Sequence, residues 1–297
     1  MALTAADVQT EMAMLWCTTF TEADYPRCRQ IAFDMVEQAL REGLDEPLFA
    51  YKSIAQSLHF LGDHAGAGHM AEKVRAQATG LIECTAVHPY ISMGIILARI
   101  AAIRGEHSEA ADIARDVLDR SRRDNPVAIC QSLALACLPS AIWAENEGAA
   151  RGYVIDLIEE AEIDQLNYWR VWGQRVSQAI DLRFNSRTTA DGITEIEGVD
   201  ALLADHLATI DGRAISQLAL RRVLNRMVGW SAPEVIRNQA AIAIWYDPLD
   251  ARRQLDEARR LAVEQNAGTW LARIDETESA LAASFRPKDR GSPPRGG

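Results

Sequence analysis

The chain has 297 residues, a formal net charge of −11 and a pI near 5.1. An acidic surface repels nucleic-acid phosphates and anionic membranes, so direct binding of the body of the protein to either is disfavoured. Hydrophobic residues make up 48% and charged residues 25% of the chain, as in ordinary soluble globular proteins. Only 10 prolines and 18 glycines interrupt it, and long helices are therefore expected.

Helical periodicity, broken by turn signals, runs along the whole chain. In the first half we expect helices over residues 5–20, 23–42, 46–61, 65–78, 128–143 and 147–163, with two more inside 88–126. In the second half we expect them over 165–184, 196–210, 214–228, 233–246, 248–265 and 268–284. The predicted fold class is all-α.

The predicted helix pairs share a spacing of small residues. Ala55, Gly62, Ala67 and Ala71 recur 43 positions later as Ala98, Gly105, Ala110 and Ala114, and more loosely as Cys137, Ala144, Ala149 and Tyr153. Small side chains let neighbouring helices approach, and glycine closes the turn between them. This spacing is typical of tetratricopeptide repeats, so the predicted fold is a tetratricopeptide-like α-solenoid, a right-handed superhelix of antiparallel helix pairs.

The repeat pattern weakens along the chain. Residues 1–165 are predicted to hold the better-preserved tetratricopeptide-like repeats. Residues 166–285 are predicted to hold degenerate repeats and a C-terminal cap of the same array. The last segment, 286–297, is rich in proline and glycine and is predicted to be disordered.

Motifs for catalysis, metal binding or cofactor binding are absent from the sequence. His59, His64 and His69 are five positions apart, and five residues turn a helix by about 140°, so the three side chains would not share a helix face. No phosphate-binding loop and no Gly-x-Ser-x-Gly motif is present. We therefore expect no enzyme activity and assign no catalytic residue, metal ligand or cofactor.

Several features favour the cytoplasm. The five cysteines form no Cys-x-x-Cys pair, which fits reduced thiols, and no basic segment of a signal peptide precedes the first apolar residues. The uncharged run 126–144 approaches the roughly 18 to 20 residues of a membrane span. It contains the polar residues Gln131, Ser132 and Ser140 and a central Pro139, and it keeps the register of the repeats. We expect a buried repeat helix there and no membrane partner.

Candidate binding residues gather on the predicted concave face, which the first helix of each pair lines. Lys52, Gln56 and His59 share one helix face, and Arg99 occupies the position equivalent to Gln56. Basic groups inside an acidic protein favour an anionic peptide or a small acidic ligand. The alternative is that Lys52 and Arg99 are ordinary exposed residues with apolar stems.

The other candidates on this face are Gln131, Trp143, Trp169 and Trp172. The tryptophans, together with Tyr168, have two interpretations. Core packing is the favoured one, because large aromatic side chains dominate protein cores. A hydrophobic binding pocket is the other.

Several blocks of the sequence resemble a known architecture. AYKSIAQSLHFLGDHAGAGHMAEKV, the pair in 88–126, LNYWRVWGQ and ARRQLDEARRLAVEQNAGTWLARI follow one another along the chain. Together they are similar to the C-terminal tetratricopeptide-like region of large bacterial signalling proteins. Those proteins join this region to a signal-transduction ATPase module and to a winged-helix DNA-binding domain or an adenylate cyclase domain. The resemblance covers most of residues 24–284, without the ATPase and output parts.

The resemblance implies a non-enzymatic scaffold or sensor module for protein–protein interaction in bacterial signalling or transcription regulation. Its partner would be a protein or peptide, such as a signalling ATPase or a transcription regulator. The alternative hypothesis is a tetratricopeptide-like domain that binds a metabolite in the superhelix channel, near Arg99, Trp143 and Trp169. A metabolite that raises the thermal stability would favour the second hypothesis, since only the native state would bind it.

Overall fold

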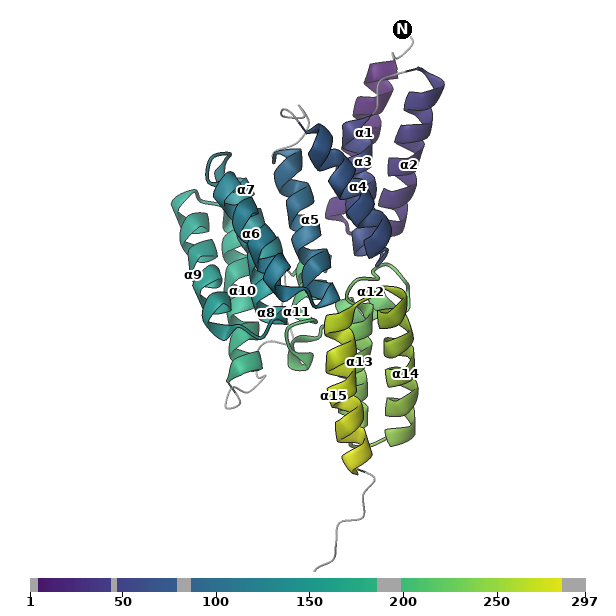
Figure 1. The fold of residues 1–297 in the computed structure, drawn as a ribbon, viewed down its shortest axis with the longest axis vertical. Coiled ribbons are helices and arrows are strands. Elements are labelled where there is room, and N and C mark those ends of the chain that lie inside the picture. The colour runs from purple at the N-terminus through teal and green to yellow at the C-terminus, as the bar shows by residue number, and fades with distance from the viewer. Residues whose placement is uncertain (1–4, 44–46, 79–86, 186–198, 285–297) are drawn as a thin grey trace, which may run out of the picture.

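The computed structural model describes residues 5–43, 47–78, 87–185 and 199–284. Every regular element in these residues is a helix, so the all-α prediction is confirmed (Figure 1). The segment 286–297, which the sequence predicts to be disordered, and Cys84 lie outside the described residues.

The first six helices form three hairpins that stand side by side (Figure 1). Each hairpin joins two helices through a short turn. The pairs are α1 (Ala5–Thr21) with α2 (Tyr25–Arg41), α3 (Leu48–Phe60) with α4 (His64–Gln77), and α5 (Pro89–Arg104) with α6 (His107–Ser121). The bounds of α1 to α4 lie within two residues of the predicted ones, because strong turn signals separate the periodic segments.

Glycines close the turns of the second and third hairpins. Gly62 and Gly105 have φ values of +90° and +88°, in the left-handed region that residues with a side chain adopt only at a cost. Asp63 then begins α4 by accepting a hydrogen bond from the N–H of Gly66 at 2.9 Å. The glycine that repeats in the sequence therefore marks a turn that repeats in the structure.

A π-helical turn interrupts the helix predicted over 128–143. The segment consists of α7 (Pro126–Ser132), the π-helical turn η1 (Leu133–Cys137) and α8 (Leu138–Trp143). Pro139 has no N–H to donate to the carbonyl of Leu135, four residues earlier. The N–H of Leu138 instead bonds to the carbonyl of Leu133, five residues earlier. The carbonyl of Leu135 is thereby available to a side chain from another helix.

The same segment, Pro126–Trp143, is apolar and long enough to cross a membrane by length and composition. It is the one such stretch among the described residues, and 72% of it is buried inside the protein. Its neighbours include α9 (Glu147–Ile163), which forms the next hairpin with α10 (Asn167–Phe184). The segment therefore has the burial of a core helix, as the sequence predicts.

The C-terminal region consists of shorter helices followed by a three-helix unit. They are α11 (Ala201–Leu207), the 3-10 turn η2 (Gly212–Ala214), α12 (Gln217–Leu224), α13 (Ala232–Ala243), α14 (Pro248–Glu264) and α15 (Gly268–Ser284). The helices predicted over 196–210 and 214–228 are thus shorter than expected. The predicted boundary at residue 165 falls in the turn between α9 and α10, which pack against each other.

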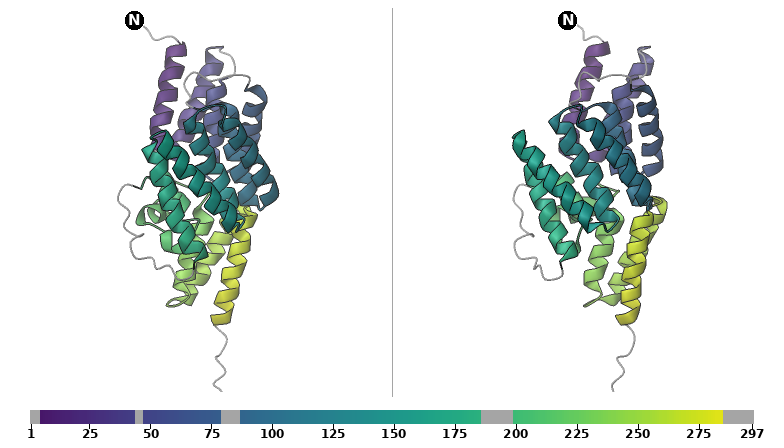
Figure 2. Two further views of the ribbon diagram at one scale, coloured as in Figure 1. Left: turned by 90° about the vertical axis from the view of Figure 1, so that its left-hand side faces the viewer. Right: turned by 60° about the vertical axis from the view of Figure 1, so that its left-hand side comes forward.

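After α10 the chain crosses back, and α13 to α15 lie against the turns of the second and third hairpins (Figures 1 and 2). The N–H of Gly229 donates to the carbonyl of Phe60 at 2.8 Å. A Cβ atom on Gly229 would lie 2.0 Å from the carbonyl oxygen of Leu61, and one on Gly268 would lie 2.4 Å from that of Arg104. Backbones approach here so closely that only glycine fits at either position.

This return path brings Trp230 and Trp270 against Trp143. Trp143, Trp172, Trp230 and Trp270 are fully buried. The ring centroid of Trp143 lies 5.7 Å from that of Trp230 and 5.3 Å from that of Trp270. The burial of Trp143 and Trp172 fits the core-packing interpretation.

Candidate functional site

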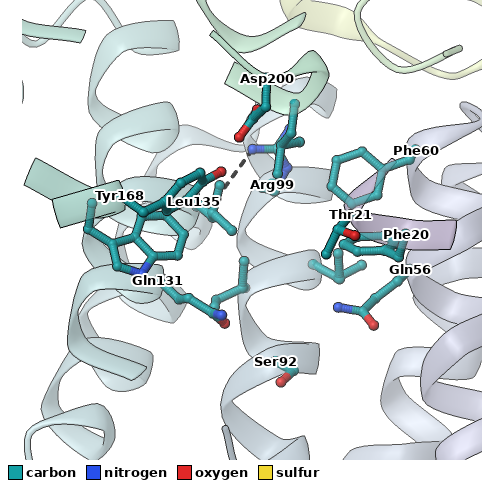
Figure 3. Close-up of a pocket in the computed structure, with 14 residues that line it drawn as sticks. Phe20, Thr21, Gln56, Phe60, Ser92, Arg99, Gln131, Leu135, Tyr168 and Asp200 are labelled. Carbon is teal, nitrogen blue, oxygen red and sulfur yellow. Dashed lines mark hydrogen bonds between the residues drawn. The ribbon is translucent and has the colours of Figure 1, made fainter. Parts of the chain in front are cut away.

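A cavity of about 300 Å³ lies between the first helices of the hairpins and α10 (Figure 3). Helices α1, α3, α5, α7 and α10, the π-helical turn and the start of α11 supply its walls. The apolar lining consists of Phe20, Phe60, Ile95, Ile96, Leu135, Trp169 and Leu202. The polar lining consists of Thr21, Gln56, Ser92, Arg99, Gln131, Tyr168 and Asp200. Pockets for drug-sized ligands span roughly 300 to 1,000 Å³, so this cavity suits a small molecule.

Arg99 is the one cation among the described residues that line the cavity, and its side chain is 1% exposed. Its Nε donates a hydrogen bond to Nε2 of His59 at 2.9 Å. Its Nη1 donates to the carbonyl of Leu135 at 3.4 Å, the dashed line in Figure 3. This is the carbonyl that Pro139 leaves without a donor four residues later. Nη2 is buried and has no hydrogen-bond partner among the described residues.

Aromatic rings, rather than a carboxylate, surround the guanidinium. Its central carbon lies 4.3 Å from the ring centroid of Trp230, 5.4 Å from that of Trp143 and 5.6 Å from that of Phe60. Such cation–π contacts offset part of the hydration free energy that the guanidinium loses on burial. Burial lowers the pKa of Arg99 to about 9, with Tyr25 acting in the opposite direction. The guanidinium therefore stays charged near neutral pH.

Buried neutral histidines lie around this cation. Burial, and after it the charge of Arg99, lower the pKa of His59 well below its usual value. The same two causes lower the pKa values of His64 and His206 to about 3. Because Nε2 of His59 accepts a hydrogen bond from Arg99, the proton of that imidazole belongs on Nδ1. Among the described residues of the site, Arg99 is thus the one that carries a positive charge.

The ring centroids of His59 on α3 and His64 on α4 lie 5.1 Å apart within one hairpin. Their spacing of five residues would place them on different faces only if they belonged to a single helix. The two residues belong to different helices, so the hairpin brings them together, while His69 is exposed on α4.

The negative charge of the cavity belongs to Asp200, which caps the N-terminus of α11. Its Oδ1 accepts a hydrogen bond from the N–H of Leu203 at 2.8 Å. Burial, and after it a hydrogen bond with Asp200, raise the pKa of the Tyr168 hydroxyl. Figure 3 shows Arg99, Asp200 and Tyr168 at one end of the cavity. The polar residues toward the other end are Gln56, Ser92 and Gln131.

The structure divides the predicted binding residues into three groups. Those that line the cavity are Gln56, Arg99, Gln131 and Trp169. Those that support the guanidinium from behind are His59 and Trp143. Trp172 is buried away from it, with its ring 5.7 Å from that of His206. Lys52 lies outside the lining, 5.7 Å from the ring of Phe49, and is 8% exposed.

Sequence reasoning missed Trp230 and Asp200. Trp230 lies in a loop between α12 and α13, and no local signal relates it to Arg99. Asp200 was expected inside a helix over 196–210, whereas it precedes the helix as its cap. An aspartate directly before an apolar run is an N-cap signal, which would have found its position but not its place in the cavity.

Metal-ligating and thiol groups do not form a second candidate site in the part of the chain that the structure describes. No cluster of three or more His, Cys, Asp or Glu side chains there could hold a metal ion. Cys28, Cys130 and Cys137 are free and buried, and burial raises the pKa of each thiol to about 12. No protein-family model, no curated protein and no solved structure matches this chain.

Proposed function

We propose that this protein is a tetratricopeptide-like, ligand-binding helical-repeat module that holds the anionic group of a small molecule beside Arg99. The observation that carries the proposal is a buried guanidinium whose Nη2 has no partner among the described residues, at the wall of a cavity. Burying an ion costs several kcal/mol unless a counter-ion and hydrogen bonds compensate it. A bound carboxylate would supply both the missing charge and the missing acceptor.

The rest of the lining supports an organic anion over an inorganic one. Ile95 and Ile96 on α5 and Trp169 on α10 offer apolar surface to the body of a ligand. Burial of that surface would add to the binding free energy at about 25 cal/mol per Å². The combination favours a molecule with one charged end and one apolar end.

The small cavity also favours a small molecule over an extended peptide. A peptide lying along the predicted face would need Lys52 and His59 to be accessible, and both are buried. The aromatic and histidine side chains behind Arg99 fill the space that a continuing groove would need. Of the two hypotheses drawn from the sequence, the metabolite-binding one fits this geometry better.

Isothermal titration calorimetry with a panel of small carboxylates tests the proposal. The panel contains aromatic and aliphatic amino acids, keto acids and fatty acids, each beside its neutral amide or alcohol. We expect at least one carboxylate to bind and its neutral counterpart to bind about tenfold or more weakly. Arg99→Gln keeps a polar side chain but removes the charge, and it should reduce binding of the carboxylate by at least the same factor.

Arg115→Gln is the matched control, because Arg115 is an exposed arginine on α6 that pairs with Asp112. It should leave the affinity unchanged. The proposal fails if no carboxylate of the panel binds at millimolar concentration, or if Arg99→Gln binds as tightly as the wild-type protein.

Protein interaction is a second candidate function, and exposed aromatic residues favour it. Trp245 is 87% exposed in the turn between α13 and α14, with Tyr246 and Leu249 exposed beside it. Exposed tryptophan and tyrosine are common centres of protein interfaces. This tip would contact a protein such as a signalling ATPase or transcription regulator in the bacterial cytoplasm, as the resemblance implies.

Cross-linking at Trp245 tests this candidate, with a photoreactive residue placed there in cells. A defined partner whose recovery falls when Tyr246 and Leu249 are changed to serine would support it. The matched control is a photoreactive residue at Ile163, an exposed apolar position at the end of α9. Identical cross-linked products from both positions would contradict it.

A further inference from the structure

The geometry of the charged end of the cavity points to a zwitterionic ligand, a free α-amino acid with a sizeable apolar side chain. This inference rests on the proposed function and narrows its ligand class. It assigns the carboxylate of the ligand to Arg99 and the ammonium to Asp200. The hydroxyl of Tyr168 lies at the same end of the cavity (Figure 3).

The charges of the lining match a zwitterion. Among the described residues that line the cavity, Arg99 is the one cation and Asp200 the one carboxylate. The two form no ion pair with each other, both line the cavity, and Nη2 of Arg99 is buried without a partner among the described residues. A ligand with only a carboxylate would satisfy Arg99 but approach Asp200 with a like charge. A ligand that adds an ammonium group next to its carboxylate would compensate both side chains.

The support behind each charged group is rigid, which suits recognition of a small headgroup. Arg99 is fixed by His59, by the carbonyl of Leu135 and by the ring of Trp230. Asp200 is fixed through its Oδ1 by the N–H of Leu203. Side chains held in place by their surroundings lose little further conformational entropy when a ligand binds.

The same reasoning separates a free amino acid from a peptide. The first residue of a peptide has an ammonium group without an adjacent carboxylate, and the last has a carboxylate without an adjacent ammonium. Only a free amino acid carries both groups on one carbon. Its side chain would point along the apolar wall of Ile95, Ile96 and Trp169.

The test compares L-phenylalanine and L-leucine with analogues that lack one charge, by calorimetry on the full chain. For phenylalanine these are 3-phenylpropionate, which lacks the ammonium, and phenethylamine, which lacks the carboxylate. We expect at least one of the two amino acids to bind about tenfold or more tightly than its own charge-deleted analogues.

Asp200→Asn supplies the second arm of the test. Asparagine is as good an N-cap as aspartate, so α11 should keep its start. The variant should weaken binding of the amino acid about tenfold, while 3-phenylpropionate should bind as well as before or better, because the like charge is gone. Asp63→Asn is the matched control, since Asp63 caps α4 in the same manner outside the cavity lining.

Each outcome has a definite meaning. If 3-phenylpropionate binds as tightly as the amino acid, or if Asp200→Asn does not weaken the amino acid, the zwitterion inference is overturned and the anion site stands. If neither the amino acids nor any other carboxylate binds, the proposed function fails together with it. If the amino acid binds selectively and Asp200→Asn removes the selectivity, both are supported.

Discussion

Two buried arginines of this molecule have opposite surroundings. Arg273 on α15 donates to Oε1 of Glu234 at 2.9 Å and to the carbonyl of Thr209 at 3.0 Å. Its Nη2 donates to Oε1 of Glu145 at 2.9 Å. Arg99 is even more deeply buried, and it donates to the neutral imidazole of His59 and to the carbonyl of Leu135. Its Nη2 has no partner among the described residues.

The difference separates a structural arginine from a candidate binding one. Carboxylates of the chain itself neutralise the charge of Arg273. These ion pairs connect α15 to α13 and to the turn before α9. Burial alone would raise the pKa of Glu234, but the guanidinium groups of Arg273 and Arg237 lower it overall. Around Arg99 the described residues supply hydrogen bonds and aromatic rings but no ion pair, and the guanidinium lies at the wall of a cavity.

Removal of Glu234 should have the largest effect on stability. Glu234→Gln would leave the buried Arg273 and the half-buried Arg237 without the carboxylate charge that they share. Breaking a buried pair in this way costs about 3 to 5 kcal/mol of the free energy of unfolding, and chemical denaturation measures it. Glu257→Gln, which breaks an exposed pair with Arg260, should cost far less, because solvent screens that pair. Equal losses would show that the buried network is not structural.

Gly229→Ala should have the next largest effect on stability, because it disturbs the loop whose Trp230 packs against Arg99. The new Cβ would lie 2.0 Å from the carbonyl oxygen of Leu61, so the loop that carries Trp230 must move. We expect a loss of about 2 to 3 kcal/mol, typical of overpacking. Gly152→Ala is the control: nothing lies within 4 Å of that Cβ, and alanine should stabilise α9 by about 0.5 to 1 kcal/mol. A stable Gly229→Ala protein would mean that this contact is loose.

The buried histidines make stability depend on pH. The imidazoles of His64 and His206 protonate near pH 6.5 in the unfolded chain and only near pH 3 in the folded one. The unfolded state therefore binds more protons in this window, and stability is lost as the pH falls below about 6.5. Each group contributes up to about 1.4 kcal/mol per pH unit.

Asp205 opposes this trend. Burial raises its pKa to about 7 although Arg222 lowers it, so its contribution to stability grows as the pH falls from about 7 toward 4. The histidines outnumber it, and the net effect of acid should be destabilising. His206→Phe should reduce the slope of unfolding free energy against pH by up to about 1.4 kcal/mol per unit below pH 6.5 and leave it unchanged above, as denaturant midpoints between pH 4 and 8 would show. An unchanged slope would contradict the neutral state of His206.

The smallest effect on stability is expected for Arg99→Gln. It removes a buried charge that lacks a counter-ion, and it weakens the hydrogen bonds to His59 and Leu135. These changes oppose each other, so the free energy of unfolding should change by no more than about 1 kcal/mol. A loss as large as that of Glu234→Gln would assign Arg99 a structural role instead.

Local patterns were sufficient for much of the secondary structure. Most helix bounds and the turns at Gly62 and Gly105 follow from periodicity and left-handed backbone, which act over a few residues. The break before Pro139 was not predicted, although the missing N–H that explains it is also a local feature. The same periodicity placed Gln56 and Arg99 on the inner helices that line the cavity. The sequence by itself thus determined the all-α class and a face of candidate residues.

Tertiary structure alone decided what that face can do. Trp230 reaches the guanidinium of Arg99 because the chain crosses back after α10, and Asp200 enters the cavity from the start of α11. Whether Arg99 has a counter-ion depends on which distant segments arrive beside it and which do not. No spacing along the chain encodes that outcome, since it results from packing between helices that are far apart in sequence.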